Sequence, residues 1–236
     1  MSHSSRREFL QATAVASLVA ANAIPATLEA AEDKKVNSSA NAFDYQHTAA
    51  PLPFDAKSLK GLSEKLIQSH WENNYGGAVK ALNTLRGRLV QALNDANTPP
   101  YVYNGLKREQ LIRTGSVVLH EFYFANLGGD GKAPADLRTR IAASFGTFDA
   151  WESEFRKIGL GLGGGSGWVV LGYNTRLKLL ENYWMADHST HAADTRPVLV
   201  MDMYEHAFQM DYGAAAAKYI DAFFANIQWD AVAKRV

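Results

Sequence analysis

Residues 161–173 read GLGGGSGWVVLGY, and this stretch divides the chain into two kinds of structure. The glycine run at 161–167 is flexible and interrupts regular structure. The apolar run at 168–173 is typical of a buried strand. Two more strands are predicted after it, at 177–184 and 198–202. The second half of the chain is therefore predicted to hold a small sheet.

Upstream of this stretch the apolar residues recur at helical spacing. A first helical stretch is predicted over 59–94 and a second over 106–126, with Pro99-Pro100 between them. Gly76-Gly77 should bend or split the first stretch. A third helical region, 134–158, breaks near Gly146-Thr147, and 211–226 is predicted to be one closing helix. The fold class is therefore α+β: an N-terminal antiparallel helical hairpin, then a C-terminal α/β domain with a small three-stranded antiparallel sheet.

Charge and composition exclude several functional classes. The chain has 236 residues, with 24 Lys+Arg against 24 Asp+Glu. It therefore has no overall field to attract nucleic acid or an anionic membrane. It has no cysteine, so thiolate metal sites, thiol catalysis and disulfides are excluded. A transition-metal site would have to use imidazole and carboxylate ligands.

The N-terminus has the order of an export signal. Arg6-Arg7 precede Phe9-Leu10, a weakly apolar run at 12–23 and then Pro25. This order resembles a twin-arginine signal, predicted over 1–31, and implies a periplasmic or secreted protein. The alternative is an ordinary basic amphipathic N-terminus. The apolar run is too short to span a bilayer. Residues 32–50 are polar and are predicted to be a linker.

Histidines and one aspartate are the candidates for chemistry. His70 and His120 lie on the two predicted hairpin helices, where a lone histidine is more often a packed residue than a ligand. Asp202 ends an apolar run, and His206 follows four residues later. A buried carboxylate has to be paired or bound to metal. Three imidazoles and a carboxylate suit iron or manganese, although an Asp–His hydrogen bond that only orders the junction is the alternative.

Four short motifs resemble the iron/manganese superoxide dismutases. Residues 202–207 read DMYEHA, close to the family signature D-x-W-E-H-A. Residues 165–168 (GSGW), 52–54 (LPF) and 227–229 (IQW) match other parts of the family pattern, and the likeness extends over about 51–236. The resemblance implies a helical hairpin domain at 51–130 and a C-terminal domain at 131–236, with the metal between them.

The resemblance also implies a site and a reaction. One Fe or Mn ion per chain, with Fe slightly favoured, would be bound by four ligands: His70, His120, Asp202 and His206. The substrate would be superoxide, converted to oxygen and hydrogen peroxide. Glu205 would reach across a homodimer interface, and no nucleic acid or membrane partner is implied beyond the export signal.

Around these ligands the sequence departs from the family pattern. The gateway tyrosine falls on Ala78, the interface His–Tyr pair falls on Asn74 and Gln209, and an arginine near the entrance falls on Ala216. The signature tryptophan is Tyr204.

Four residues are predicted to surround the metal and tune it. In the family a glutamine from one of two positions holds the metal-bound water. The resemblance places Ser116, which is too short for this, at the first position and His188 at the second, so His188 is predicted to hold the water. Tyr75 is predicted to replace the gateway tyrosine. Trp168 and Tyr204 complete the set. Because of these departures, an alternative function stays open: a metal-binding family member that has lost fast dismutation and serves in binding or slow redox chemistry. A third interpretation is a purely structural protein, in which the presence of these three histidines and one aspartate would be a coincidence.

Overall fold

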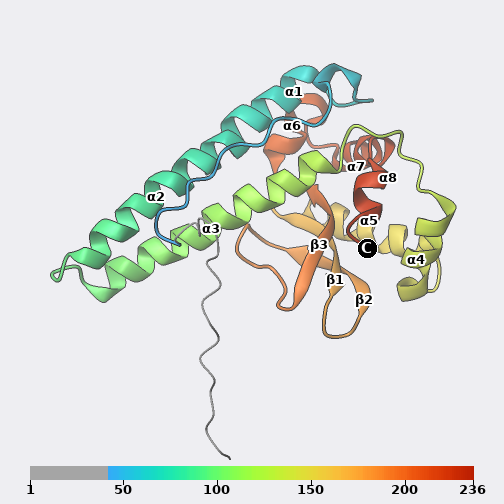
Figure 1. Cartoon of the computed structure of the whole chain (residues 1–236). Coiled ribbons are helices and arrows are strands. Elements are labelled where there is room, and N and C mark those ends of the chain that lie inside the picture. Colours follow the sequence, from blue (N-terminus) through green and yellow to red (C-terminus); the bar gives the residue numbers. More distant parts are fainter. Residues whose placement is uncertain (1–41) are drawn as a thin grey trace, which may run out of the picture. The chain divides into compact units, whose positions relative to one another are not determined.

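The computed structural model describes residues 42–236, which belong to one compact unit. The predicted signal at 1–31 and the first part of the predicted linker lie outside the described residues. Within 42–236 no helix combines the length and apolarity needed to cross a bilayer. The elements are arranged as a long helical pair beside a small sheet with its own helices (Figure 1), which confirms the α+β fold class.

The first arm of the hairpin is one continuous helix, which changes from α-helical to π-helical and back to α-helical. It consists of α1 (Glu64–Ser69), the π-helical segment η3 (His70–Tyr75) and α2 (Gly76–Asn94). Ser63 caps α1, because its Oγ accepts a hydrogen bond from the Leu66 N–H at 3.1 Å. Helical backbone continues through Gly76-Gly77. The interruption predicted at these glycines instead lies just before them, as the π-helical segment.

The second arm is α3 (Pro100–Ala125), which packs antiparallel to α2. It begins six residues earlier than predicted, since Pro100 occupies a first-turn position that needs no backbone N–H. α3 also contacts the last strand of the sheet. This contact brings residues of the hairpin against the C-terminal part of the chain.

The next two helices cover the sheet. α4 (Ala135–Phe145) ends at Gly146, whose φ of 81° lies in the region that favours glycine. α5 (Phe148–Leu162) starts at Thr147, whose Oγ1 accepts from the Ala150 N–H at 3.0 Å. The predicted break is therefore confirmed. α5 extends into the glycine run, so the first two residues of that run are helical, contrary to expectation.

Three antiparallel strands form the sheet, in the order β2-β1-β3. They are β1 (Trp168–Asn174), β2 (Leu179–Met185) and β3 (Thr195–Asp202). The first five residues of β1 and the last five of β3 are buried, because β1 is central and helices pack against the sheet. In the register, Trp168 lies opposite Asp202. The sheet therefore places the end of β3 beside the start of β1.

The prediction of a single closing helix over 211–226 is wrong. The structure has α6 (Gln209–Tyr212), α7 (Ala216–Ala225) and α8 (Trp229–Ala233). The chain leaves the helical region at Gly213, which has φ 54° and ψ −128°. A short 3-10 turn, η4 (Glu205–Ala207), connects β3 to α6.

Candidate metal centre

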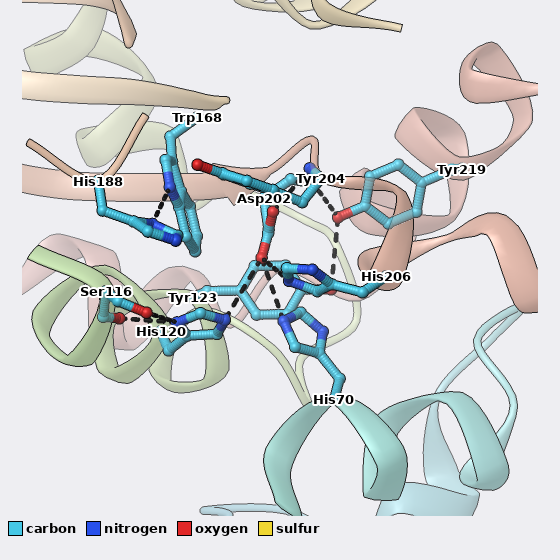
Figure 2. Close-up of polar contacts among 10 residues, drawn as sticks. All are labelled: His70, Ser116, His120, Tyr123, Trp168, His188, Asp202, Tyr204, His206 and Tyr219. Atoms are coloured by element: carbon cyan, nitrogen blue, oxygen red, sulfur yellow. Dashed lines mark hydrogen bonds and ion pairs between the residues drawn. The ribbon is translucent and has the colours of Figure 1, made fainter. Parts of the chain in front are cut away.

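Four side chains from four elements meet between the hairpin and the sheet. His70 is the first residue of η3, His120 lies on α3, Asp202 ends β3 and His206 lies on η4. One ligand atom from each lies within 4.8 Å of all the others. Figure 2 shows the three imidazoles converging on the Asp202 carboxylate. The structure thus brings together all four residues that the sequence nominated as metal ligands.

A single carboxylate oxygen lies at the centre of this cluster. Asp202 Oδ2 is 3.1 Å from His70 Nε2, 3.1 Å from His206 Nε2 and 3.7 Å from His120 Nε2. The side chains of Asp202 and His70 are fully buried, whereas the His206 side chain is 25% exposed. Of the four residues, His206 is therefore the one that solvent reaches.

The imidazole of His120 presents one nitrogen to the cluster. Its Nδ1–H donates to the Ser116 main-chain oxygen at 2.7 Å, one helical turn earlier in α3. The neutral ring therefore has its lone pair on Nε2, and this buried atom has no hydrogen-bond partner among the described residues. A hydrogen bond to the far nitrogen is the usual way in which a protein orients a metal-binding histidine.

His70 is buried without any hydrogen-bond partner, among the residues that the structure describes, on either ring nitrogen. Its Nε2 lies close to Asp202 Oδ2, but in an orientation that makes no hydrogen bond. Buried polar atoms left unpaired cost on the order of 1–3 kcal/mol each. A metal ion bound among these atoms would satisfy the free nitrogens, so the residues present fit such an ion.

The charges of the cluster also suit a cation. Burial lowers the pKa of His70, and burial lowers the pKa of His120 to about 3, so both rings are neutral near pH 7. Burial also acts against a charge on His206, but the Asp202 carboxylate outweighs it and raises the pKa of His206. Burial alone would raise the pKa of Asp202, yet His206 and His70 hold it well below its usual range. The site therefore offers one negative charge and two neutral imidazoles.

Asp202 is held in place by its backbone and by its second oxygen. Oδ1 accepts a hydrogen bond from the Tyr204 N–H at 2.8 Å. The buried Tyr219 hydroxyl of α7 donates to the Asp202 main-chain oxygen at 2.6 Å. Oδ2 is then left to face the imidazoles. Tyr219 was missed by the sequence analysis, since no local signal links a tyrosine on α7 to a residue seventeen positions earlier.

His188 lies beside the cluster, and Trp168 orients it. The Trp168 Nε1–H donates to His188 Nδ1 at 3.0 Å. The His188 ring centroid is 6.1 Å from that of His120. The Tyr204 ring stacks on His188 at 4.8 Å and on His206 at 5.3 Å. Trp168, Tyr204 and His188 therefore form one aromatic group next to the four ligands, although their roles in the reaction stay predictions.

The loop that carries His188 depends on Gly115 of α3. A Cβ at this position would lie 1.7 Å from the His188 main-chain oxygen. Only glycine allows this close approach between helix and loop. The role of Gly115 was not predicted from the sequence, because a glycine inside a helix does not by itself reveal which distant segment it contacts.

Tyr75 is buried in the hairpin, but its hydroxyl is already engaged. It donates to Glu121 Oε1 at 2.9 Å and accepts from the Ala50 N–H at 2.7 Å. Burial raises the pKa of Tyr75 to about 12. Its ring centroid lies 6.3 Å from that of His120. Tyr75 is thus near the cluster through its ring, and its role as a gateway stays a prediction.

Four further positions that the sequence singles out differ in their exposure to solvent. Ala78 is buried and has only a methyl group where the family pattern has a tyrosine. Glu205 and Gln209 are exposed and Asn74 is half-buried. These three were predicted to lie at a dimer interface, and this assignment stays a prediction.

The chain is similar to known superoxide dismutases over most of its length. Residues 133–235 match the family model for iron/manganese superoxide dismutases, C-terminal domain. An iron superoxide dismutase of Cupriavidus metallidurans is 51% identical over 185 residues, covering 78% of this chain and 93% of that protein. An iron enzyme of Aquifex aeolicus is 33% identical over 186 residues, covering 76% and 86%. A manganese enzyme of Halobacterium salinarum is 29% identical over 193 residues, covering 80% and 94%. With four candidate ligands clustered between the hairpin and the sheet, and with this likeness over three quarters of its length, the chain belongs to the iron/manganese superoxide dismutase family.

Proposed function

We propose that this protein is a superoxide dismutase that uses one iron ion bound by His70, His120, Asp202 and His206. The observation that carries the proposal is the buried cluster of three imidazoles around one carboxylate oxygen, in which nitrogens of His70 and His120 have no hydrogen-bond partner within 42–236. Three nitrogen ligands and one anionic oxygen suit iron or manganese and leave a position for a small anion. Iron is proposed because the relatives that are 51% and 33% identical are iron enzymes by name.

Two superoxide ions and two protons give one oxygen and one hydrogen peroxide. An iron ion held by His70, His120, Asp202 and His206 would supply the one-electron redox chemistry that this reaction needs. The protein itself orients the ligand side chains and supplies the negative charge that a cation needs. Asp202 contributes the negative charge, and Ser116 holds the His120 ring so that Nε2 faces the site.

We propose that His188 holds a proton beside the reacting oxygen species. Its Nδ1 accepts from Trp168, so the neutral ring has its proton on Nε2. Burial lowers the pKa of His188, which keeps the ring neutral near pH 7. A neutral imidazole N–H can donate to an anion without adding a second cation next to the ligands. His188 therefore tunes the site through one hydrogen bond.

The His188→Leu variant is expected to lower the dismutation rate by about tenfold or more and to shift the iron reduction potential, because tuning hydrogen bonds of this kind are worth roughly that factor. The measurements are pulse-radiolysis or stopped-flow rates at known iron content, together with a redox titration. His188→Gln should retain part of the rate, since an amide also donates a hydrogen bond. His191→Leu is the control, because His191 is exposed and bonds only the Thr195 main-chain oxygen among the described residues. Unchanged rate and potential in His188→Leu would remove His188 from the site.

The direct test of the proposed function is the superoxide decay rate of the protein at measured iron and manganese occupancy. The rate should rise in proportion to bound iron and exceed that of free iron. A protein fully loaded with iron but without a rate above free metal would favour the alternative, a metal-binding member that has lost fast dismutation. Manganese bound in preference to iron would contradict the choice of metal.

We infer that the protein is exported by the twin-arginine route and acts in the periplasm or outside the cell. The support is the order of Arg6-Arg7, apolar run and Pro25 in the sequence. Replacing both arginines with lysine is expected to abolish export, although the charge is unchanged, because the pathway recognises the arginine pair. Fractionation of the producing cells measures this. The matched control, Lys34→Arg with Lys35→Arg, should be exported normally; export of the double lysine variant would contradict the route.

We also propose a homodimer, in which Glu205 reaches the His206 of the second copy. The support is the exposed position of Glu205 on η4, next to a ligand that is itself partly exposed. Sedimentation of the iron-loaded protein should give twice the monomer mass, and Glu205→Ala should weaken the dimer. A monomer at micromolar concentration would contradict it.

A further inference from the structure

The segment 43–50, called the N-terminal strap here, runs beside the helical hairpin (Figure 1). Its first anchor is on α2. The Asn83 side chain bonds both main-chain groups of His47: Oδ1 accepts from the N–H at 2.8 Å and Nδ2 donates to the oxygen at 2.9 Å. Arg86 donates to the Tyr45 main-chain oxygen at 2.6 Å and lies 5.0 Å from the centre of the Tyr45 ring. Side chains of the hairpin thus bind mainly the main-chain groups of the strap.

The second anchor is on the π-helical segment η3. Both main-chain groups of Ala50 are used. The Ala50 N–H donates to the Tyr75 hydroxyl at 2.7 Å, and the Trp71 Nε1–H donates to the Ala50 oxygen at 3.0 Å. Trp71 and Tyr75 are four residues apart, near the two ends of η3. One residue of the strap therefore ties both ends of this segment.

The segment that is tied in this way carries a metal ligand. His70 is the first residue of η3. π-helical turns are rare and occur mostly at functional sites. His120 is oriented by the Ser116 carbonyl, but neither ring nitrogen of His70 has a hydrogen-bond partner within 42–236. The position of the His70 ring therefore depends on the backbone of η3 and on ring contacts with Tyr123 and Phe124.

We propose that the N-terminal strap positions the metal ligand His70 by holding η3 in its π-helical form. This inference rests on the proposed metal site. The strap acts on His70 indirectly, through Trp71 and Tyr75. It orients the ring as a hydrogen bond to His70 Nδ1 would, a bond that no residue within 42–236 makes. Release of the strap at either anchor lets η3 relax and moves the His70 ring away from the geometry that binds the metal.

The experiment compares two single variants, their double variant and a control, all as the full-length, iron-loaded protein. Trp71→Phe keeps an aromatic ring and removes the donor to Ala50. Asn83→Ala removes both hydrogen bonds to the His47 main chain and leaves the Arg86 contact with Tyr45 in place. The matched control is Asn94→Ala, because Asn94 is exposed on the same helix and outside the strap contacts. The measurements are the rate of iron loss to a chelator, the electron paramagnetic resonance spectrum of the ferric protein and hydrogen exchange at Ala50.

Both test variants should exchange the Ala50 amide faster, lose iron roughly tenfold faster and show an altered ferric spectrum. Asn94→Ala should match the parent in all three. The double variant should lose iron no faster than the stronger single variant, because both changes release one strap. Parent-like iron loss and spectra in both variants would overturn the inference, even if their melting temperatures fall. A parent that binds no iron would instead contradict the proposed function.

Discussion

The Asp202→Asn variant is expected to lose tight iron binding, and with it at least about 100-fold of the dismutation rate. Asp202 provides the single negative charge among the four ligands, and its Oδ2 lies 3.1 Å from two imidazole nitrogens. An amide of the same shape has no charge to offer the cation. The amide oxygen can still accept the hydrogen bond from the Tyr204 N–H, so the local fold should persist.

Two measurements check this result: metal content after dialysis against iron, and superoxide decay per chain. Asp149→Asn is the control. Asp149 lies on α5, far from the ligands in sequence. Its side chain is 87% exposed and forms an ion pair with Arg138. It should keep both metal and activity. If Asp202→Asn retained stoichiometric iron and a parent-like rate, the carboxylate would be only a structural partner of the histidines, and the proposed site would be wrong.

The Gly115→Ala variant is expected to be destabilised by on the order of 2–4 kcal/mol and to lose activity. The added methyl group would lie 1.7 Å from the His188 main-chain oxygen and 2.8 Å from its carbon. Backbone atoms cannot rotate away as a flexible side chain can. The loop must move, and His188 would leave its hydrogen bond with Trp168.

Gly105→Ala provides a matched control on the same helix. A Cβ at Gly105 meets nothing within 4 Å, so this change should stabilise the protein by up to about 1 kcal/mol. Chemical denaturation gives both free energies of unfolding, and the dismutation rate reports on His188. A Gly115→Ala protein as stable and active as the parent would mean that the loop at His188 has another position that works equally well.

Much of the fold follows from local patterns in the sequence. The break between α4 and α5 was predicted because Gly146 and Thr147 are strong end and start signals. The three strands were predicted from short apolar runs, and the structure confirms them within a few residues. The break at Gly213 was not predicted, since the four alanines after it favour a helix. The positive φ at Gly213 is visible only once the chain is folded.

The candidate ligands were predicted from the sequence for two different reasons. Asp202 and His206 stand out because a carboxylate and an imidazole follow a buried apolar run within five residues. His70 and His120 were nominated mainly by resemblance, as their spacing alone is equally consistent with packed helix residues. The structure brings the four together by placing α3 in contact with both β3 and η3.

The sequence by itself determined the fold class, the absence of thiolate chemistry and the short His–Asp motif, because these depend on residue type and near spacing. Tertiary structure alone decided which atoms meet. The Tyr219 hydroxyl bonds the Asp202 main-chain oxygen, Gly115 contacts the His188 main chain, and Ala50 bonds the Tyr75 hydroxyl of η3. The physical reason is that these contacts join residues between 17 and 73 positions apart, or use main-chain groups that every residue shares. No side-chain pattern records such pairs, so only the folded chain reveals them.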